Sequence, residues 1–427
     1  MASSVAAFDA TLLADRDAGL IAAGILDDPW LDGRRRIDHA PVVLTPAAVQ
    51  ALARAATTTA WYLDAAVQAA SADPRLLADL GFDPTLAAIA RLDAPRWLTL
   101  ARADVFLVDG DAAQVCEINC DTPTGLAETV ELGALAAAAH PGLADPSARL
   151  GERWQALVRQ AIPTSASAQL TAGIVDATEM TEDLGHIRLL TRWLEEAGCA
   201  VVRGSPFNLH GIGADRVGLF GQPLDLLVRH YKTDWWAARR PVRRDESPCP
   251  DPAPLARELS LIAHAQAAGT LAVINPWGAA IGQSKRTLAL AWERPALFAP
   301  EMRAEVARHL PKTRWLESLP RAQLIDERDA WVLKSDFGCE GDEVVLGRDT
   351  TAEQWAEAID AAMPGRWIAQ RAFTPRRSAD SSIANHGVFL IGGLPSGIFT
   401  RRSVGATTRH AVACPTLVDA TGTGAAA

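Results

Sequence analysis

The chain has 427 residues, 49% of them hydrophobic, and a formal net charge of −10 at pH 7. A chain of this length and composition can bury large cores and is expected to divide into two or three lobes. The negative balance argues against nucleic acid as a main partner, because nucleic-acid-binding proteins present a basic surface. Short arginine runs such as Arg34–Arg36 have acidic neighbours and are interpreted as solvated surface.

Cysteine spacing and the N-terminus indicate the compartment. The six cysteines show neither the paired spacing of a zinc site nor a disulfide framework, which fits a reducing environment. The first residues, 1–9, lack a basic start, so no signal peptide is expected. The alanine-rich stretch at 132–143 is too short to span a bilayer. We therefore expect a cytoplasmic protein with no membrane partner.

The N-terminal part, up to about residue 94, is expected to be mostly helical. Apolar residues recur near the 3.6-residue period at 46–70 and 84–92, as on one face of a helix. Two apolar-rich segments, 97–108 and 113–119, then flank an Asp-Gly turn, the strongest short-range signal for a β-hairpin. A helix over 126–139 follows.

Strand and helix patterns alternate in the rest of the chain. Strands at 172–176 and 200–203 flank a helix at 184–197, which predicts a small lobe built on a parallel sheet. Further helices are expected at 254–267, 285–294 and 351–363, and strands at 225–228, 330–334, 343–346, 366–371, 387–392 and 397–401. The expected units are residues 1–165 (helical segment plus hairpin), 166–250 (small α/β lobe) and 251–427 (C-terminal lobe).

The hairpin carries a polar face. Side chains two residues apart on a strand share a face, so Arg102 and Asp104 point together, as do Glu117 and Asn119. A four-residue loop would set Asp104 opposite Glu117 and Arg102 opposite Asn119, while Cys116 would face the core. Two carboxylates and an amide oxygen suit Mg²⁺, and an arginine can stabilise charge on a transferring phosphoryl group. The alternative is an ordinary solvated strand face.

Lysine is rare in this chain, since only four of the 41 basic residues are lysines. A retained lysine therefore indicates a site that requires a compact ammonium group; the alternative is a surface lysine without a specific role. Lys334 ends an apolar strand and precedes a loop with Gly338 and Gly341, a flap whose backbone N–H groups could cover phosphates. Lys285 opens a helical pattern, where the helix dipole and an ammonium together attract anions.

These segments resemble, in the same order, those of the glutathionylspermidine synthase-like ATP-grasp ligases. The resemblance rests on the Glu-Ile-Asn-Cys-Asp-Thr-Pro-Thr block and on segments at 225–231, 276–277, 284–285, 332–334, 340–341, 370 and 397–401. The pair Glu117 and Asn119, which resembles the family's metal ligands, precedes Lys285 and Lys334 in the sequence, as in the circularly permuted branch of the ATP-grasp enzymes. The resemblance implies an α/β (α+β) fold: a circularly permuted ATP-grasp core, a small parallel-sheet lobe and an N-terminal helical segment.

The resemblance also implies an activity, with ATP and Mg²⁺ (two ions) as cofactors and small molecules as substrates. A carboxylate would attack the ATP γ-phosphate, and an amine would capture the resulting acylphosphate. The implied roles are: catalytic, Arg102 and Arg401; metal, Asp104, Glu117 and Asn119; ATP-binding, Lys285, Lys334, Gly338, Gly341 and Gln370; substrate-binding, Thr122, Thr124, Glu182 and Asp183. The last two, beside Thr181, can equally be N-terminal helix caps.

Several positions depart from the family pattern. Cys339 stands where the flap usually has arginine, Arg402 where the final motif has glutamate, and Asn275 where an acid often precedes the Pro-Trp pair. The acid could be a glutathione-like peptide and the amine a polyamine. The alternatives are a peptide or natural-product ligase with other substrates, and a non-catalytic ATP-binding regulatory protein. The aromatic loop at 231–236 and Trp277 line a cleft or, as is commoner for tryptophan, pack in a core.

Overall fold

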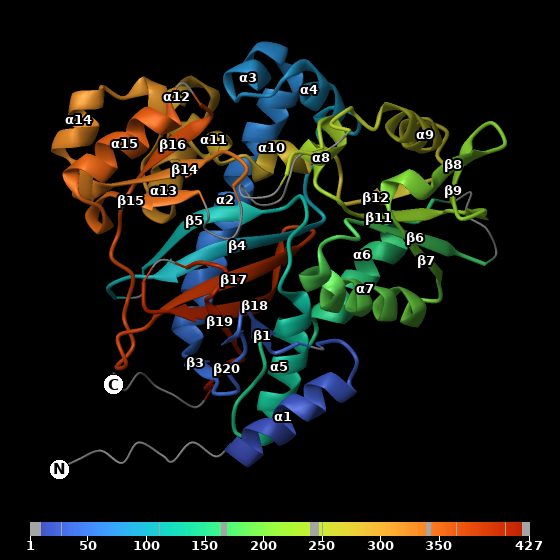
Figure 1. Ribbon diagram of the computed structural model, residues 1–427, viewed down its shortest axis with the longest axis horizontal. Helices are drawn as coiled ribbons and strands as arrows, with labels where there is room; N and C mark the ends of the chain where they lie inside the picture. The colour runs from blue at the N-terminus through green and yellow to red at the C-terminus, as the bar shows by residue number, and fades with distance from the viewer. Residues whose placement is uncertain are drawn as a thin grey trace.

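The computed structural model describes residues 10–26, 28–110, 112–163, 169–239, 247–249, 251–338, 343–363, 365–405 and 407–420. The expected flap residues Cys339 and Gly341 lie outside these ranges. Within the described part of the chain, no helix is long and apolar enough to cross a bilayer. The elements form a mixed α/β fold, as predicted, with a central antiparallel sheet between a parallel-sheet lobe and a second antiparallel lobe (Figure 1).

The central sheet joins strands that are far apart in the sequence. Its strands in order are β19 (Val412–Cys414), β18 (Leu394–Ser403), β17 (Ile383–Ile391), β4 (Leu100–Leu107) and β5 (Ala113–Asn119), all antiparallel to their neighbours. The first and the last of the three expected units therefore share one sheet. The fold brings the hairpin of β4 and β5 beside the C-terminal strands.

A long helix, α2 (Pro46–Ala72), covers one face of this sheet (Figure 1). It begins where the Thr45 side chain accepts a hydrogen bond from the N–H of Ala48, with Pro46 in the first turn. Helix is thus confirmed where the apolar period predicted it, but short strands precede it. The remaining elements of this part are α1 (Ala10–Ala22), β1 (Trp30–Leu31), β2 (Arg34–Arg35), β3 (Val42–Leu44), α3 (Pro74–Asp79), α4 (Pro84–Ala90), α5 (Leu126–Ala139) and β20 (Thr416–Val418).

The small lobe has the predicted strand–helix–strand unit. Its parallel sheet has the order β12-β11-β6-β7, and α7 packs on β6 and β7. Because β12 belongs to it, the expected boundary at residue 250 cuts through this sheet. The elements are α6 (Leu150–Ala161), β6 (Thr171–Asp176), α7 (Leu184–Glu196), β7 (Ala200–Gly204), β8 (Leu209–Ile212), β9 (Arg216–Leu219), β10 (Gln222–Pro223), β11 (Leu226–His230), α9 (Ala256–Ala267) and β12 (Ala272–Ile274).

The third lobe is an antiparallel sheet of order β13-β16-β14-β15 with helices around it (Figure 1). The helix expected at 285–294 is divided in two at Ala289, and the aromatic loop at 231–236 contains the short helix α8. The remaining helices and strands, of which α8 and α10 lie outside this lobe, are α8 (Thr233–Ala237), α10 (Ala279–Gln283), α11 (Lys285–Leu288), α12 (Leu290–Glu293), α13 (Pro300–His309), β13 (Thr313–Trp315), α14 (Arg321–Asp326), β14 (Trp331–Ser335), β15 (Val344–Leu346), α15 (Ala352–Ala362) and β16 (Trp367–Arg371).

The register of the hairpin agrees with the prediction, although the route to it differs. Asp104 lies opposite Glu117, and Arg102 lies opposite Asn119. The turn is one residue shorter than expected, because the N–H of Val108 donates to the carbonyl of Ala112 at 3.0 Å. A β-bulge between the pairs formed by Asp104 and Val105 restores the register.

Candidate active site

A cavity of about 960 Å³ opens beside the central sheet. Its walls come from one face of the central sheet, from the lysine-bearing lobe and from the start of α7. Most of the residues predicted from the sequence line it: Arg102, Asp104, Glu117, Asn119, Thr122, Thr124, Glu182, Asp183, Lys334, Gly338, Gln370 and Arg401. The fold therefore brings these residues together around one cavity.

Asp104 lies buried between two arginines. The Nε and Nη2 atoms of Arg102 donate to its two carboxylate oxygens at 2.7 and 3.2 Å, and Nη2 of Arg401 donates at 2.8 Å. Arg102 also donates to the carbonyl of Thr124 at 2.7 Å. Its side chain crosses β17 at Gly387, where a Cβ atom would lie 2.6 Å from Cδ of Arg102. The glycine leaves room for the arginine.

Glu117 faces both predicted lysines. Its Oε2 atom lies 3.2 Å from Nζ of Lys285. Burial opposes its ionisation, but the positive charges of Lys285, Lys334 and Arg102 outweigh burial and lower the pKa of Glu117 to about 2. Lys334 is held at 3.1 Å from the carbonyl of Cys116 and at 2.8 Å from Oε1 of Gln370. The cavity therefore holds an ionised carboxylate within a group of cations.

The predicted reason for Lys285 needs correction. The helix that it opens, α11, has only four residues, and the N–H of Lys285 donates to the carbonyl of Asp336 at 3.0 Å. The end of this helix therefore offers no free N–H at that residue to an anion. The ammonium instead contacts Glu117 and donates to the carbonyl of Gly338 at 2.7 Å. The N–H of Gly338 donates to Oγ of Ser335, so it does not face a phosphate here.

The expectation for Cys116 is wrong. It is the extra residue of the bulge, and it lines the cavity beside Glu117 instead of the core. An unbulged strand would have turned it to the opposite face. Burial raises the pKa of its thiol to about 12, so it stays protonated. The five cysteines in the described ranges, Cys116, Cys120, Cys199, Cys249 and Cys414, are free thiols.

The donors on the hairpin face fit a magnesium ion that is shared with a nucleotide. Among the described residues, no group of three or more His, Cys, Asp or Glu side chains could hold a metal alone. Mg²⁺ usually takes one or two carboxylates together with substrate phosphates, which matches the set of Asp104, Glu117 and Asn119. Asp104 is paired with Arg102 and Arg401, and Glu117 is paired with Lys285.

The start of α5 forms the floor between the two arginines. Gly125 has a φ of 91°, and a Cβ atom there would lie 2.5 Å from the ring of Phe399. The guanidinium groups of Arg102 and Arg401 lie 5.8 and 5.6 Å from the centre of the same ring. The segment containing Thr122 and Thr124 thus runs tightly past a pair of cations.

Sequence reasoning missed an ionic cluster behind the site. Arg229 is fully buried, donates to Asp121 at 2.6 Å and lies 4.7 Å from the Trp277 ring. Asp121 also accepts the N–H and the hydroxyl of Thr233, both at 2.7 Å. The amide of Asn275 donates to the carbonyl of Asp121 at 3.1 Å. A charged residue inside the apolar strand β11 was the available signal, because buried charges are paired.

Asp183, at the start of α7, contacts a histidine and makes no side-chain capping bond. Its Oδ2 atom lies 3.1 Å from Nε2 of His230. Burial opposes ionisation, but this contact lowers the pKa of Asp183. The centre of the His230 ring lies 4.5 Å from that of the His186 ring, and the two rings are tilted. Burial, together with His230, lowers the pKa of His186 to about 3. His186 is therefore neutral, and it lines the cavity beside Glu182.

Two departures from the family pattern lie away from the cavity. Arg402 points off the site and pairs with Asp38 and Asp380, so its charge does not face the ligand. The second departure, Asn275, accepts hydrogen bonds from Thr99 and from the N–H of Leu100, and so connects the hairpin to β12.

Trp236 and Trp277 are fully buried and meet edge-to-face at 5.2 Å, which confirms core packing for them.

The sequence model for the glutathionylspermidine synthase preATP-grasp family matches residues 29–418. The chain belongs to this family. A glutathione synthetase-like effector from Globodera pallida, solved in its apo form, shares the fold with a TM-score of 0.58 at 11% identity, over 96% of this chain and 97% of that one. A putative γ-glutamylcysteine synthetase from Methylobacillus flagellatus matches at 0.47 and 14%, over 88% and 89%. No curated protein matches the sequence.

Membership of the glutathionylspermidine synthase preATP-grasp family makes the chain a ligase-type synthetase, for which ATP use is implied. Oxygen atoms of the hairpin and the ammonium of Lys334 line one cavity, and Lys285 lies 3.2 Å from Glu117. What the chain joins is a separate question, which depends on the rest of the cavity.

Proposed function

We propose that the protein is an ATP-dependent carboxylate–amine ligase that forms an amide bond through an acylphosphate. One observation carries the proposal: Asp104, Glu117 and Asn119 share one face of a hairpin with Arg102, and both scarce lysines reach that face. A protein that binds nucleotide without catalysis has less need for all of these oxygen ligands, the arginine and the lysines together. The arrangement brings oxygen ligands and phosphate-binding cations into one cavity.

Different protein groups bind the adenine, the phosphates and the magnesium ions of the nucleotide. Gln370 is buried and fixed by Lys334 and by the hydroxyl of Thr313, so it presents one orientation to an adenine. Apolar walls beside it come from Phe106, Val332, Val344 and Leu346. Lys285 and Lys334 bind phosphate oxygens, and Asp104, Glu117 and Asn119 would hold the magnesium ions. Bound there, the ions would supply positive charge that offsets the negative charge of the transferring phosphoryl group.

The arginines act on the transferring group. Arg102 is held on two sides by Asp104 and Thr124, so its guanidinium is already oriented before the substrate arrives. A substrate carboxylate beside Arg102 and Arg401 attacks the γ-phosphorus, and ADP leaves. Preorganised cations stabilise the charge that spreads over the phosphoryl oxygens in such a step. The amine then attacks the acyl carbon, and phosphate leaves with the electron pair of the broken C–O bond.

The acid enters beside Thr122 and Thr124, and the amine enters beside Glu182 and Asp183, where carboxylates can hold a cationic group. A glutathione-like peptide and a polyamine are the substrates that the family name suggests. We propose the cytoplasm as the compartment, since ATP is available there. Arg402 does not add charge to the cavity, because it pairs with Asp38 and Asp380 and is not among the lining residues.

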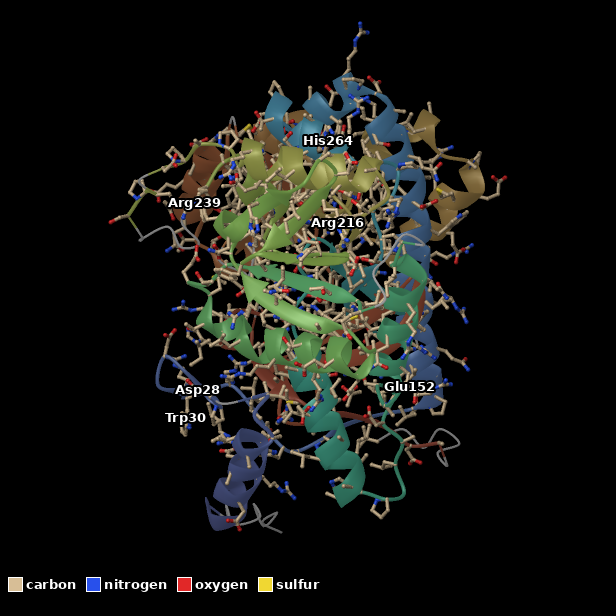
Figure 2. All side chains as sticks on the ribbon, turned by 90° about the vertical axis from the view of Figure 1, so that its right-hand side faces the viewer. Asp28, Trp30, Glu152, Arg216, Arg239 and His264 are labelled. Carbon is tan, nitrogen blue, oxygen red and sulfur yellow. The ribbon has the colours of Figure 1, made fainter. Side chains whose placement is uncertain are left out.

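The test is ADP release by the purified protein with Mg²⁺ and ATP, over a matrix of acids and amines. The acids are glutathione, short peptides and amino acids; the amines are spermidine, diamines and amino acids. Release that needs one acid and one amine together supports the ligase. Asp104→Ala and Asp104→Asn should both abolish it, while Glu152→Gln on the exposed surface should not (Figure 2). Nucleotide binding without release for any pair would favour the regulatory alternative.

A further inference from the structure

Gln283 ends α10 and lies between the metal hairpin and Lys285. Its Oε1 atom accepts two successive backbone N–H groups at the end of β5, those of Cys120 at 2.8 Å and of Asp121 at 3.1 Å. Its Nε2 atom donates to Oδ1 of Asn119 at 3.3 Å. One side chain therefore contacts a proposed metal ligand and also the backbone that follows it.

These contacts determine how the amide of Asn119 is turned. Backbone N–H groups can only donate, so the oxygen of Gln283 must face them and its NH₂ group must face Asn119. The oxygen of Asn119 then faces Gln283, and its NH₂ group faces Oε1 of Glu117 at 3.5 Å. The last torsion of an asparagine side chain is otherwise broad, so an unsupported Asn119 would rotate.

The segment that carries Gln283 is packed firmly against the hairpin. The thiol of Cys120 donates to the carbonyl of Ala279 at 3.3 Å. A Cβ atom on Gly282 would lie 2.7 Å from the ring of Trp97 and 3.0 Å from Sγ of Cys120. Lys285 lies two residues after Gln283 and contacts Glu117 at 3.2 Å. The position of the phosphate-binding lysine and the orientation of Asn119 thus depend on the same short stretch.

We propose that Gln283 is a positioning residue, which orients Asn119 toward the magnesium ion and sets its place relative to Lys285. The inference rests on the proposed function, because it takes Asn119 as a metal ligand. Side chains that orient a metal ligand typically change metal affinity by about 10- to 100-fold when they are removed. Gln283 should therefore act on the magnesium dependence of nucleotide binding more than on nucleotide binding itself.

The experiment measures binding of a non-hydrolysable ATP analogue at increasing Mg²⁺ concentration, by calorimetry, for the full chain. Gln283→Met keeps the length of the side chain and removes its amide. We expect the half-saturating Mg²⁺ concentration to rise about 10- to 100-fold. Affinity for the analogue without Mg²⁺ should stay close to that of the wild type, because Lys285 and Lys334 remain.

Two variants serve as controls. Gln114 lies on β5, the strand that carries Asn119, and its side chain donates to the carbonyl of Arg308 at 2.8 Å. Gln114 is not among the residues that line the cavity, so Gln114→Met should not change the Mg²⁺ dependence of nucleotide binding. Cys120→Ala loosens the packing of α10 but keeps the contacts of Gln283 with Asn119. This variant distinguishes a general loss of stability, which thermal unfolding measures, from a loss of the orientation of the Asn119 amide.

A Mg²⁺ dependence of Gln283→Met equal to that of Gln114→Met would overturn the inference and leave the ligase proposal intact. An equal shift in Cys120→Ala would also overturn it, since loosened packing would then explain the effect. If the wild type binds the analogue at no Mg²⁺ concentration, the proposed function fails first and the inference fails with it.

Discussion

Glu117 offers a quantitative test of the site, because its charge is controlled by named neighbours. Burial opposes ionisation, yet Lys285, Lys334 and Arg102 lower its pKa from 4.5 to about 2. A fall of this size corresponds to roughly 3 kcal/mol of favourable interaction between the carboxylate and the cations. Glu117→Gln removes this interaction and leaves Lys285 beside a neutral group. The side chain changes little in size, so packing is conserved.

We expect the free energy of unfolding to fall by about 3 kcal/mol at pH 7 in Glu117→Gln. The folded pKa lies below the unfolded one, so the stabilisation is fully present above about pH 4.5 and is lost as the pH falls toward 2. The difference between wild type and variant should thus be constant from pH 7 to pH 5 and shrink below. Urea unfolding followed by tryptophan fluorescence measures it, since the chain has 13 tryptophans.

The matched control is Glu152, whose ion pair with Arg149 lies at the surface (Figure 2). Its side chain is 66% exposed, and such pairs contribute at most about 1 kcal/mol. Glu152→Gln should therefore be nearly neutral at every pH. A loss below about 1 kcal/mol for Glu117→Gln at pH 7, or a loss that persists at pH 2, would refute the electrostatic reasoning.

Three further variants test other parts of the site. Arg229→Met should destabilise by about 3–5 kcal/mol in urea unfolding, because it leaves Asp121 buried without its partner, and adding Asp121→Asn should recover part of the loss. Gly387→Ala should lower ADP release about 100-fold by displacing Arg102, with nucleotide binding retained. Arg402→Ala should leave the kinetics of ADP release unchanged; a raised KM would show that its charge reaches the substrate.

The local elements were predictable because their signals are local. The Asp-Gly turn between apolar strands predicted the hairpin, and strict alternation put Arg102 and Asp104 on one face with Glu117 and Asn119. The pairing held even though the turn and the bulge differ from the expectation. A bulge depends on a single extra residue and has no side-chain period, so the misplacement of Cys116 could not be foreseen.

Contacts between distant segments were not predictable from one sequence. The hairpin completes its sheet with β17 and β18, from the far end of the chain, and these strands supply Gly387 and Arg401. Nothing in the period of either segment indicates which edge it will pair with. Arg229 was recognisable as an unusual charge in an apolar strand, but its partner Asp121 could be found only in three dimensions.

The charge near the hairpin differs in sign from the net charge of −10 that the chain carries. Four cations, Arg102, Arg401, Lys285 and Lys334, surround two carboxylates, Asp104 and Glu117, so this cluster carries an excess of two positive charges (4 − 2). The remaining excess negative charge lies outside the cluster. Because burial strengthens these interactions, the local field rather than the net charge determines what the cavity attracts. If Glu117 binds magnesium as proposed, its contact with Lys285 would be replaced and the ammonium would become available to a phosphate, so metal binding and nucleotide binding would be coupled.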